Sequence, residues 1–348
     1  METNAAKIYN LVGAEAVLTE AEDLRKYLTG FSSSYGYVLT DKNGTTFYTD
    51  SRYVEGASAY LKNSDIRVKQ HTGDFTELVK SYKEVAVPLG RILYPDYEKL
   101  KALDVKIADS MPAFTKAMSV KQDYELEYVK KACEIADGAY ISLLGKIKEG
   151  MSENEVAALL EYEMRKLGAS GTSFDTIVAF GENSSVPHHE TGLRKLKFGD
   201  VVLIDFGCKF GGYCSDCTRT VLFGDNGKQA EFKQNYLNVF EAHMLAKEKI
   251  TCGMTGAEAD AIARNYLKKY GLDKYFTHSL GHGIGINVHE FPRLSPKSAD
   301  VLLNNMVFSD EPGVYFEGKF GIRIEDTVTL EDGKVLSLTD SDKNLTIL

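Results

Sequence analysis

The feature that most constrains the fold is a short sequence that occurs twice. Residues 150–155 (GMSENE) are matched 103 positions later by residues 253–258 (GMTGAE). In both copies a Ser or Thr is followed three residues later by Glu, a capping box that starts a helix. A long helical pattern precedes each copy, at about 121–148 and 228–250, and strand patterns follow it. We therefore expect an internal duplication in which two pairs of helices pack outside a curved antiparallel sheet.

A second feature is the segment 201–220 (VVLIDFGCKFGGYCSDCTRT), in which two strand-like runs flank a Gly-Gly pair. This pattern predicts a β-hairpin. Asp205 and Asp216 lie diagonally if the loop is 211–212, and directly opposite if it is 210–211. Either register places both carboxylates on one face of the sheet. Facing carboxylates in an apolar sheet repel each other, so a positive charge must lie between them, most simply a metal ion.

Two other interpretations of this segment are weaker. Arg219 has the wrong parity to share a face with both aspartates, so a structural ion pair accounts for them poorly. Cys214 and Cys217 have the spacing of a zinc or redox motif, but residues three apart on a strand point to opposite faces. We interpret them as packing residues. The chain has five cysteines, an odd number that fits reduced thiols in the cytoplasm.

Composition narrows the functional classes. The chain has 348 residues and a formal net charge of −9, so binding to nucleic acid or to an anionic membrane has no electrostatic support. The N-terminus lacks the basic and apolar regions of a signal peptide, and no apolar run approaches the ~18 residues of a membrane span. We expect a cytoplasmic protein with two domains.

The first domain is expected over residues 1–118 as a small α/β unit, and the second over 119–348 as an α+β unit. A break at 109–119 containing Pro112 separates them. Asp41-Lys-Asn-Gly44 predicts a hairpin turn. The strands that flank this turn are predicted at 35–40 and 45–49, and the other strands of the domain at 66–69, 85–87 and 105–108. Helices are predicted at 52–61 and 75–82.

The remaining polar candidates lie in the last third of the chain. His282 is flanked by glycines within HSLGHGIGINVHE, Glu311 precedes a Pro-Gly turn, and Glu325 follows Arg323 on one face of a strand. With the two aspartates these give four carboxylates and one imidazole. Two divalent cations carry a charge of +4, which cancels four carboxylates. The excess of oxygen donors favours Mn²⁺, with Co²⁺, Zn²⁺ or Fe²⁺ as alternatives.

These motifs resemble those of the pita-bread metallopeptidases. The resemblance rests on DFG to GYCSDCTRT, on HSLGHGIGINVHE, and on the EPG and GIRIED segments around Glu311 and Glu325. Residues 27–31 (YLTGF) and 50–53 (DSRY) are similar to the creatinase-like N-terminal domain of the Xaa-Pro branch, which contains prolidase and aminopeptidase P. The resemblance therefore runs essentially from end to end and implies a pita-bread catalytic domain preceded by a creatinase-like domain.

The resemblance also implies roles for individual residues. Asp205 would be a terminal ligand, Asp216 and Glu325 would bridge two metal ions, and His282 and Glu311 would each bind one. Glu311 would also carry a proton to the leaving nitrogen. The residues implied to contact the substrate are His188, His278, His289 and Arg323. Among them His188 and His289 would stabilise the oxyanion, and Arg323 would hold Glu325 or a substrate carboxylate.

The activity implied is hydrolysis of small peptides with proline at the second position, foremost as an Xaa-Pro dipeptidase. The alternative is an Xaa-Pro aminopeptidase acting on longer peptides. Methionine aminopeptidases share the ligands but lack such an N-terminal domain, and creatinase keeps that domain but loses the ligands. A metal-free pita-bread module that binds peptides or proteins is the alternative of another class, and the complete ligand set argues against it. The N-terminal domain of such proteins implies a homodimer.

Overall fold

The computed structural model describes residues 3–348, and the chain divides into two compact units, Met1–Met118 and Ser119–Leu348. The first unit is built on a six-stranded mixed sheet of order β4-β3-β2-β1-β5-β6. Its strands are β1 (Ala16–Thr19), β2 (Tyr37–Asp41), β3 (Gly44–Thr49), β4 (Arg67–Gln70), β5 (Glu84–Val87) and β6 (Lys106–Asp109). Its helices are α1 (Asn4–Val12), α2 (Glu22–Thr29), α3 (Val54–Leu61), α4 (Tyr94–Lys101), α5 (Met111–Ser119) and the 3₁₀ turn η1 (Phe75–Leu78).

Two expectations for this unit are wrong. The helix expected at 75–82 is only the single turn η1, because the chain must turn again to enter β5 at Glu84. The break expected at 109–119 is instead helix α5. Pro112 lies in its first turn, where a missing N–H costs no intrahelical hydrogen bond. The hairpin turn at Asp41–Gly44 is confirmed, since these two residues pair across β2 and β3.

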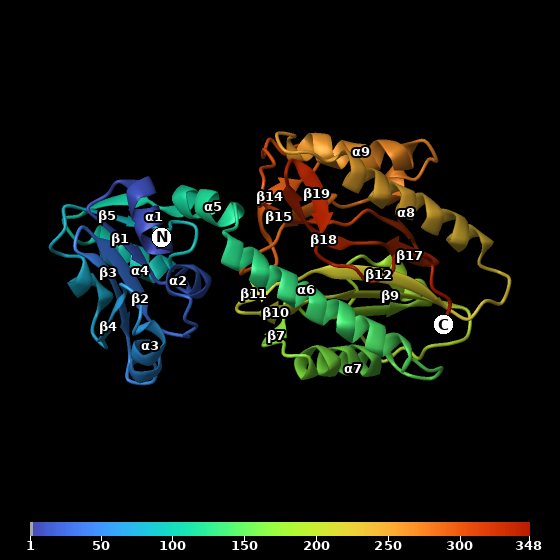
Figure 1. The fold of residues 1–348 in the computed structure, drawn as a ribbon, viewed down its shortest axis with the longest axis horizontal. Coiled ribbons are helices and arrows are strands. Elements are labelled where there is room, and N and C mark those ends of the chain that lie inside the picture. Colours follow the sequence, from blue (N-terminus) through green and yellow to red (C-terminus); the bar gives the residue numbers. More distant parts are fainter. Residues whose placement is uncertain (1–2) are drawn as a thin grey trace. The chain divides into compact units, whose positions relative to one another are not determined.

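The second unit contains two helix pairs with strands between them. Helices α6 (Asp123–Leu144) and α7 (Glu153–Lys166) lie on one side of the strands, and α8 (Ala230–Lys249) and α9 (Gly256–Lys268) lie on the other (Figure 1). The strands are β7 (Gly171–Thr172), β8 (Ile177–Phe180), β9 (Asp200–Phe206), β10 (Cys208–Phe210), β11 (Tyr213–Cys214), β12 (Cys217–Phe223), β13 (Gly281–Gly283), β14 (Glu290–Leu294), β15 (Val307–Asp310), β16 (Gly313–Phe316), β17 (Phe320–Arg323), β18 (Asp326–Glu331) and β19 (Lys334–Ser337). Short 3₁₀ turns lie at η2 (Gly181–Ser185) and η3 (Asp273–Tyr275).

The duplicated sequence produces matching structure. Both capping boxes form, and α7 and α9 begin 103 positions apart, at Glu153 and Gly256. Each helix pair has its own apolar core. Leu160 shares one core with residues of strands β8 and β9, whereas Leu267 shares another with residues of β15 and β18. The antiparallel strands form separately hydrogen-bonded sheets, chiefly β12-β9-β8 and β14-β13-β15-β18-β19.

The Gly-Gly hairpin fixes the register of the first aspartate pair. Gly211 and Gly212 both have positive φ, at 60° and 92°, which suits the tight turn between β10 and β11. The same register continues outward, so that Asp205 pairs with Thr218 across β9 and β12. Asp216 therefore lies diagonally from Asp205, as the 211–212 loop predicts. Arg219 points away from both aspartates and forms a buried ion pair with Asp326 at 2.9 Å.

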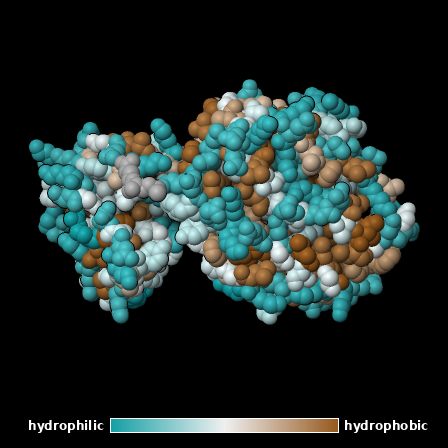
Figure 2. All heavy atoms as spheres, in the orientation of Figure 1, coloured by the Kyte–Doolittle hydropathy of each residue, from teal (hydrophilic) through white to brown (hydrophobic). Residues whose placement is uncertain are grey.

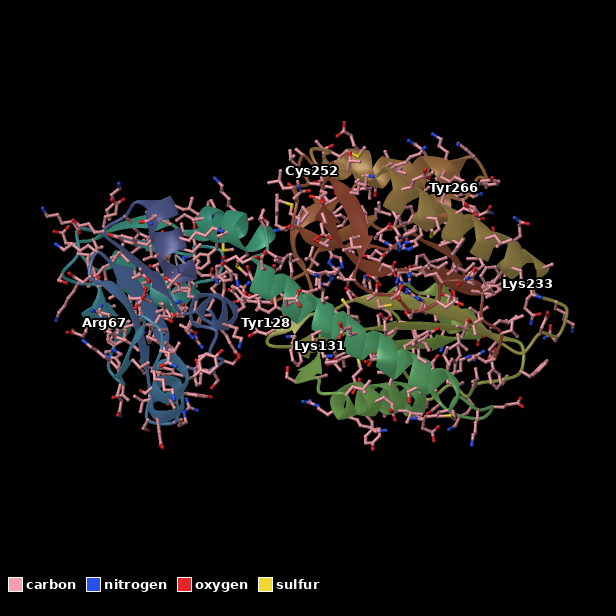
Figure 3. All side chains as sticks on the ribbon, viewed as in Figure 1. Arg67, Tyr128, Lys131, Lys233, Cys252 and Tyr266 are labelled. Atoms are coloured by element: carbon pink, nitrogen blue, oxygen red, sulfur yellow. The ribbon has the colours of Figure 1, made fainter. Side chains whose placement is uncertain are left out.

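Cys214 and Cys217 pack in the interior, as expected. Four of the five cysteines are buried and Cys252 is exposed, near the turn between α8 and α9 (Figure 3). The Cys214 thiol donates to the carbonyl of Ile286, and the Cys217 thiol to that of Glu325. Within the described residues no helix is long and apolar enough to cross a membrane. The visible face of the molecule is largely hydrophilic, with separate apolar patches (Figure 2).

Candidate metal centre

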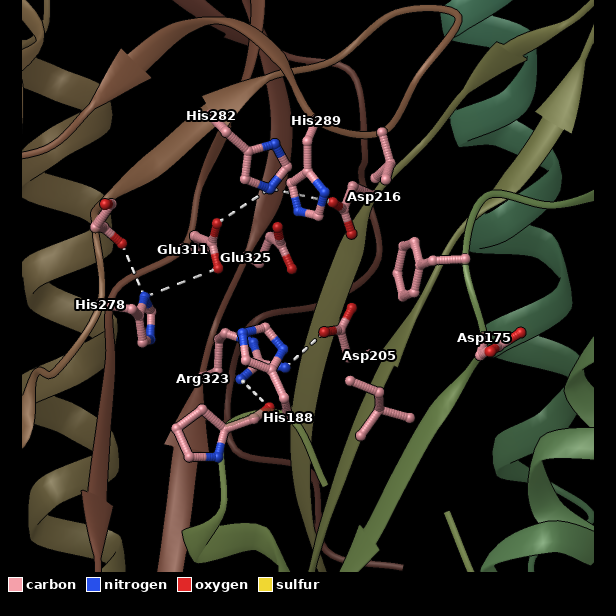
Figure 4. A pocket seen from close by; sticks show the side chains of 15 residues that line it. Asp175, His188, Asp205, Asp216, His278, His282, His289, Glu311, Arg323 and Glu325 are labelled. Atoms are coloured by element: carbon pink, nitrogen blue, oxygen red, sulfur yellow. Dashed lines mark hydrogen bonds and ion pairs between the residues drawn. The ribbon is translucent and has the colours of Figure 1, made fainter. Parts of the chain in front are cut away.

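All nine predicted site residues line one cavity in the second unit. Its volume is about 370 Å³, within the ~300–1,000 Å³ range of pockets that bind small molecules. The strands of both halves converge there (Figure 4). The predicted residues that line it are His188, Asp205, Asp216, His278, His282, His289, Glu311, Arg323 and Glu325.

The carboxylates lie where strands end or are interrupted. Asp205 is the second-last residue of β9, and Asp216 occupies the gap between β11 and β12. Glu311 lies between β15 and β16, and Glu325 between β17 and β18. At such interruptions the backbone leaves the regular ladder, so these side chains can converge on one point. Their convergence brings together residues more than a hundred positions apart.

The tightest group consists of Asp216, His282 and Glu325, each of which offers one ligand atom within 4.8 Å of the others. His282 Nε2 lies 3.6 Å from Asp216 Oδ2 and 3.3 Å from Glu311 Oε1. The other ring nitrogen, Nδ1, lies 3.2 Å from the carbonyl oxygen of Gly283, which can only accept a hydrogen bond. Nδ1 therefore carries the proton, and the lone pair of Nε2 faces two carboxylates.

The electrostatics of this group call for a cation. Burial, followed by repulsion from neighbouring carboxylates, raises the pKa of Asp216 and that of Glu325 well above their usual values. Burial is also the main cause that raises the pKa of Glu311 to about 8 and lowers that of His282 to about 4. The buried atom Asp205 Oδ1 has no hydrogen-bond partner among residues 3–348. Carboxylate oxygens around a neutral imidazole are a donor set that fits divalent cations.

Arg323 forms hydrogen bonds with residues other than Glu325, the protein partner that we expected. Its guanidinium donates to Asp205 Oδ2 at 2.6 Å, to the Tyr315 hydroxyl at 2.6 Å and to Thr218 Oγ1 at 2.9 Å. Glu325 instead accepts a hydrogen bond from Thr218 Oγ1 at 2.6 Å. The expectation that Arg323 holds Glu325 is therefore wrong, because β17 ends at Arg323 and the chain turns before Glu325.

Comparison with known proteins agrees with this geometry. Residues 127–332 match the model of metallopeptidase family M24, and residues 5–117 match the creatinase/prolidase N-terminal domain. The chain belongs to metallopeptidase family M24. This M24 peptidase is 37% identical to the Xaa-Pro dipeptidase of Pyrococcus furiosus over 89% of its own length and 88% of the relative's.

Solved structures give the same result for the whole chain. The M24 peptidase superposes on the Xaa-Pro dipeptidase from Bacillus anthracis with a TM-score of 0.92, at 35% identity over 99% of both chains. It also superposes on the X-Pro aminopeptidase from Thermotoga maritima with a TM-score of 0.90, at 36% identity over 98% of this chain and 99% of that one. As a metallopeptidase, it is an enzyme that uses divalent metal ions.

Several residues of the M24 peptidase's site were not identified from sequence. Three hydroxyl groups hold site residues in place: that of Tyr315 binds Arg323, that of Thr218 binds Glu325, and that of Ser309 binds Glu311. Thr218 had a usable signal, since it lies opposite Asp205 in the register that the Gly-Gly turn predicts. Tyr315 and Ser309 had none, because neither belongs to a recognisable motif. The cavity is also lined by Phe174, Asp175 and Ile177.

The raised carboxyl pKa values predict how the metal-free M24 peptidase responds to pH. A group whose pKa is higher in the folded state contributes stability that is present below its unfolded pKa and is lost as the pH rises through its folded pKa. For Glu311 that window runs from 4.5 to about 8. We expect the free energy of unfolding of the metal-free protein to fall by a few kcal/mol, in order of magnitude, between about pH 5 and about pH 8.

Urea unfolding of the chelator-treated protein at several pH values measures this effect. Adding Mn²⁺ should remove most of the loss at high pH, because the cations compensate the carboxylates. A metal-free protein that is as stable at pH 8 as at pH 5 would show that burial and neighbouring charges do not raise the pKa values of Asp216, Glu311 and Glu325 as argued.

Proposed function

We propose that this peptidase hydrolyses Xaa-Pro bonds with two divalent cations bound by Asp205, Asp216, His282, Glu311 and Glu325. The observation that carries the proposal is the convergence of four carboxylates and a neutral imidazole in one cavity, in a chain similar to Xaa-Pro peptidases. The excess of oxygen donors supports Mn²⁺. Two relatives from Pyrococcus that are named Xaa-Pro dipeptidases support dipeptides as substrates.

Bound divalent ions supply a Lewis acid for the scissile carbonyl and lower the pKa of water to near neutrality. The other steps belong to side chains of this protein. Glu311 accepts a hydrogen bond from Ser309 Oγ at 3.0 Å, which orients its carboxyl group toward the cavity. We assign it the transfer of a proton to the leaving nitrogen, because the secondary amine of proline must be protonated to depart.

His188 and His289 lie exposed on the cavity wall, and we assign them hydrogen bonds to the carbonyl oxygen as its negative charge develops. His278 is placed differently. Its Nδ1 lies 2.8 Å from the carbonyl oxygen of Ser279, and its Nε2 lies 2.9 Å from the Tyr315 hydroxyl. With both ring nitrogens engaged, His278 offers the substrate the apolar surface of its ring.

Arg323 and Tyr315 form a chain of hydrogen bonds from Asp205 to His278. Burial opposes the charged form of Arg323, but its pKa stays well above the ordinary value because Tyr315 and Asp205 lie beside it. Burial lowers the pKa of His278 to about 3, so the ring is neutral at physiological pH. The chain fixes one wall of the cavity, and we propose that the proline side of the substrate lies against it, with a spare Arg323 N–H for a substrate carboxylate.

Rates on three peptides test the substrate assignment. With Mn²⁺ supplied, Ala-Pro should be hydrolysed and Ala-Ala should be slower by at least tenfold, because packing of a ring in a shaped pocket is worth ~1–3 kcal/mol. Ala-Pro-Ala should be a poor substrate of a dipeptidase. Equal rates on Ala-Pro and Ala-Ala would contradict the proline assignment.

A preference for Ala-Pro-Ala would instead establish the Xaa-Pro aminopeptidase, the second candidate that the Thermotoga structure supports. A metal-free binding module is tested separately, because it would bind Ala-Pro-containing peptides without hydrolysing them at any Mn²⁺ concentration.

The residues that line the cavity belong to the second unit, and we propose that the N-terminal unit over residues 1–118 pairs two subunits into a homodimer while residues 119–348 carry the chemistry. Support comes from its match to the creatinase/prolidase N-terminal domain. Light scattering that finds an active monomer at micromolar concentration would contradict this. We also propose a cytoplasmic location, supported by five thiols of which none is in a disulfide within the described chain.

A further inference from the structure

A buried charged cluster lies behind the ligand-bearing strands and does not line the cavity. His243 on helix α8 is fully buried. Its Nδ1 lies 3.1 Å from Asp310 Oδ2, and its Nε2 lies 3.3 Å from Asp326 Oδ2. The two contacts are at ion-pair distance but lack the alignment of hydrogen bonds. One imidazole ring therefore spans two carboxylates.

The two aspartates are linked to the proposed metal ligands by the chain itself. Asp310 and Asp326 are direct partners in the β15–β18 ladder. Asp310 immediately precedes Glu311, and Asp326 immediately follows Glu325. The aspartates contact His243 on helix α8, whereas the neighbouring glutamates line the cavity.

The partners of the two aspartates differ. Asp326 also lies near Arg219 at 2.9 Å, Lys343 at 3.2 Å and Lys247 at 3.3 Å, and it accepts hydrogen bonds from Ser337 and Thr339. The carboxylate oxygens of Asp310 accept no aligned hydrogen bond within residues 3–348, and His243 is its ion-pair partner. Asp326 is thus anchored to the structure, and His243 joins Asp310 to that anchor.

We propose that His243 is a positioning residue whose ring fixes the separation of Asp310 and Asp326, and thereby that of Glu311 and Glu325 on the cavity side. The inference rests on the ligand assignment made under the proposed function. Its physical basis is that metal ligands must be held within about 0.5 Å of their working positions by the residues around them. Burial opposes the charged form of His243, but the two carboxylates outweigh it and raise the pKa of the ring.

Mn²⁺ binding measured by calorimetry tests the inference without relying on activity. His243→Leu should weaken Mn²⁺ binding by about 10–100-fold, the effect typical of losing a partner behind a metal ligand. The matched control is Val239→Ala, a fully buried apolar change one turn earlier on the same helix. It should lower stability and leave Mn²⁺ affinity unchanged.

A second variant separates positioning from simple charge compensation. His243→Leu leaves Asp310 buried and unpaired, whereas His243→Leu with Asp310→Asn removes that charge and still lacks the bridge. If His243 positions the ligands, the double variant should recover stability toward urea and keep the weakened Mn²⁺ affinity. If the single variant does not fold, the Mn²⁺ affinity of the double variant tests the inference on its own.

Wild-type Mn²⁺ affinity in His243→Leu, or its full recovery in the double variant, would overturn the inference while leaving the proposed function intact. A wild-type protein that binds no Mn²⁺ would overturn the ligand assignment, and the inference with it. Weakened affinity in both variants, with the control unaffected, supports the bridge.

Discussion

Replacing Asp216 with Asn should reduce peptidase activity by roughly 10³-fold or more and leave the metal-free protein at least as stable as the wild type. Asp216 is buried in the three-residue group whose ligand atoms lie within 4.8 Å of one another. Loss of a metal ligand removes several kcal/mol of transition-state stabilisation, and ~1.4 kcal/mol corresponds to tenfold in rate. The same change relieves repulsion among the carboxylates. Burial, followed by repulsion from Glu325, raises the pKa of Asp216, so its charged form is unfavourable in the metal-free protein.

Activity on Ala-Pro, bound Mn²⁺ per chain and urea unfolding after chelation measure the three parts of this prediction. Asp225→Asn is the matched control, since it makes the same chemical change at an aspartate paired with Lys233 outside the cavity. It should leave activity and metal content unchanged. An Asp216→Asn variant that retains two Mn²⁺ ions, or that is clearly less stable than the wild type without metal, would contradict the charge argument.

His289→Ala should lower kcat by about 10²–10³-fold with little change in KM, which is the cost of losing one donor to the oxyanion. The ring lines the cavity, and its centroid lies 4.3 Å from that of His282 in an edge-to-face arrangement. Partial burial at the cavity wall, followed by the neighbouring His188, lowers its pKa, so at neutral pH it donates through an uncharged N–H. Such a donor acts mainly when negative charge develops, which is why the effect should appear in kcat.

Mn²⁺ affinity separates this role from a packing role. If His289 only supports the ring of His282, its removal should weaken Mn²⁺ binding in step with activity, and the oxyanion assignment would then be wrong. His289→Gln retains an N–H donor of similar reach and should recover part of the lost kcat. Equal losses in the Ala and Gln variants would show that the donor itself is unimportant.

Sequence patterns predicted well those features that depend on local backbone rules. The Gly211-Gly212 turn predicted the diagonal placement of Asp205 and Asp216, and the capping boxes predicted where α7 and α9 begin. Local rules failed where the surrounding tertiary structure determines the backbone conformation. The helix expected at 75–82 shrinks to one turn, and α5 forms across a segment where Pro112 suggested a break.

Contacts between distant parts of the chain were beyond such rules. Nothing in the neighbourhood of Arg323 distinguishes Asp205 from Glu325 as its partner, because both carboxylates are compatible with its strand face. The bridge made by His243 joins a helix to two strands more than sixty positions away. An isolated histidine on an amphipathic helix carries no signal of that kind, so only the assembled structure reveals it.

The cavity carboxylates come from both copies of the duplicated unit. Asp205 and Asp216 belong to the first copy, and His282, Glu311 and Glu325 belong to the second. Neither copy alone encloses a metal site, so bound ions would act as a cross-link between them. Any motion that moves the copies apart also separates the ligands. The rate at which bound metal exchanges with solvent would therefore measure how often that motion occurs. A protease that cuts the 224–229 connection should then give two fragments that remain associated through ion pairs such as Arg323–Asp205 and Arg219–Asp326, and removal of the metal should weaken that association.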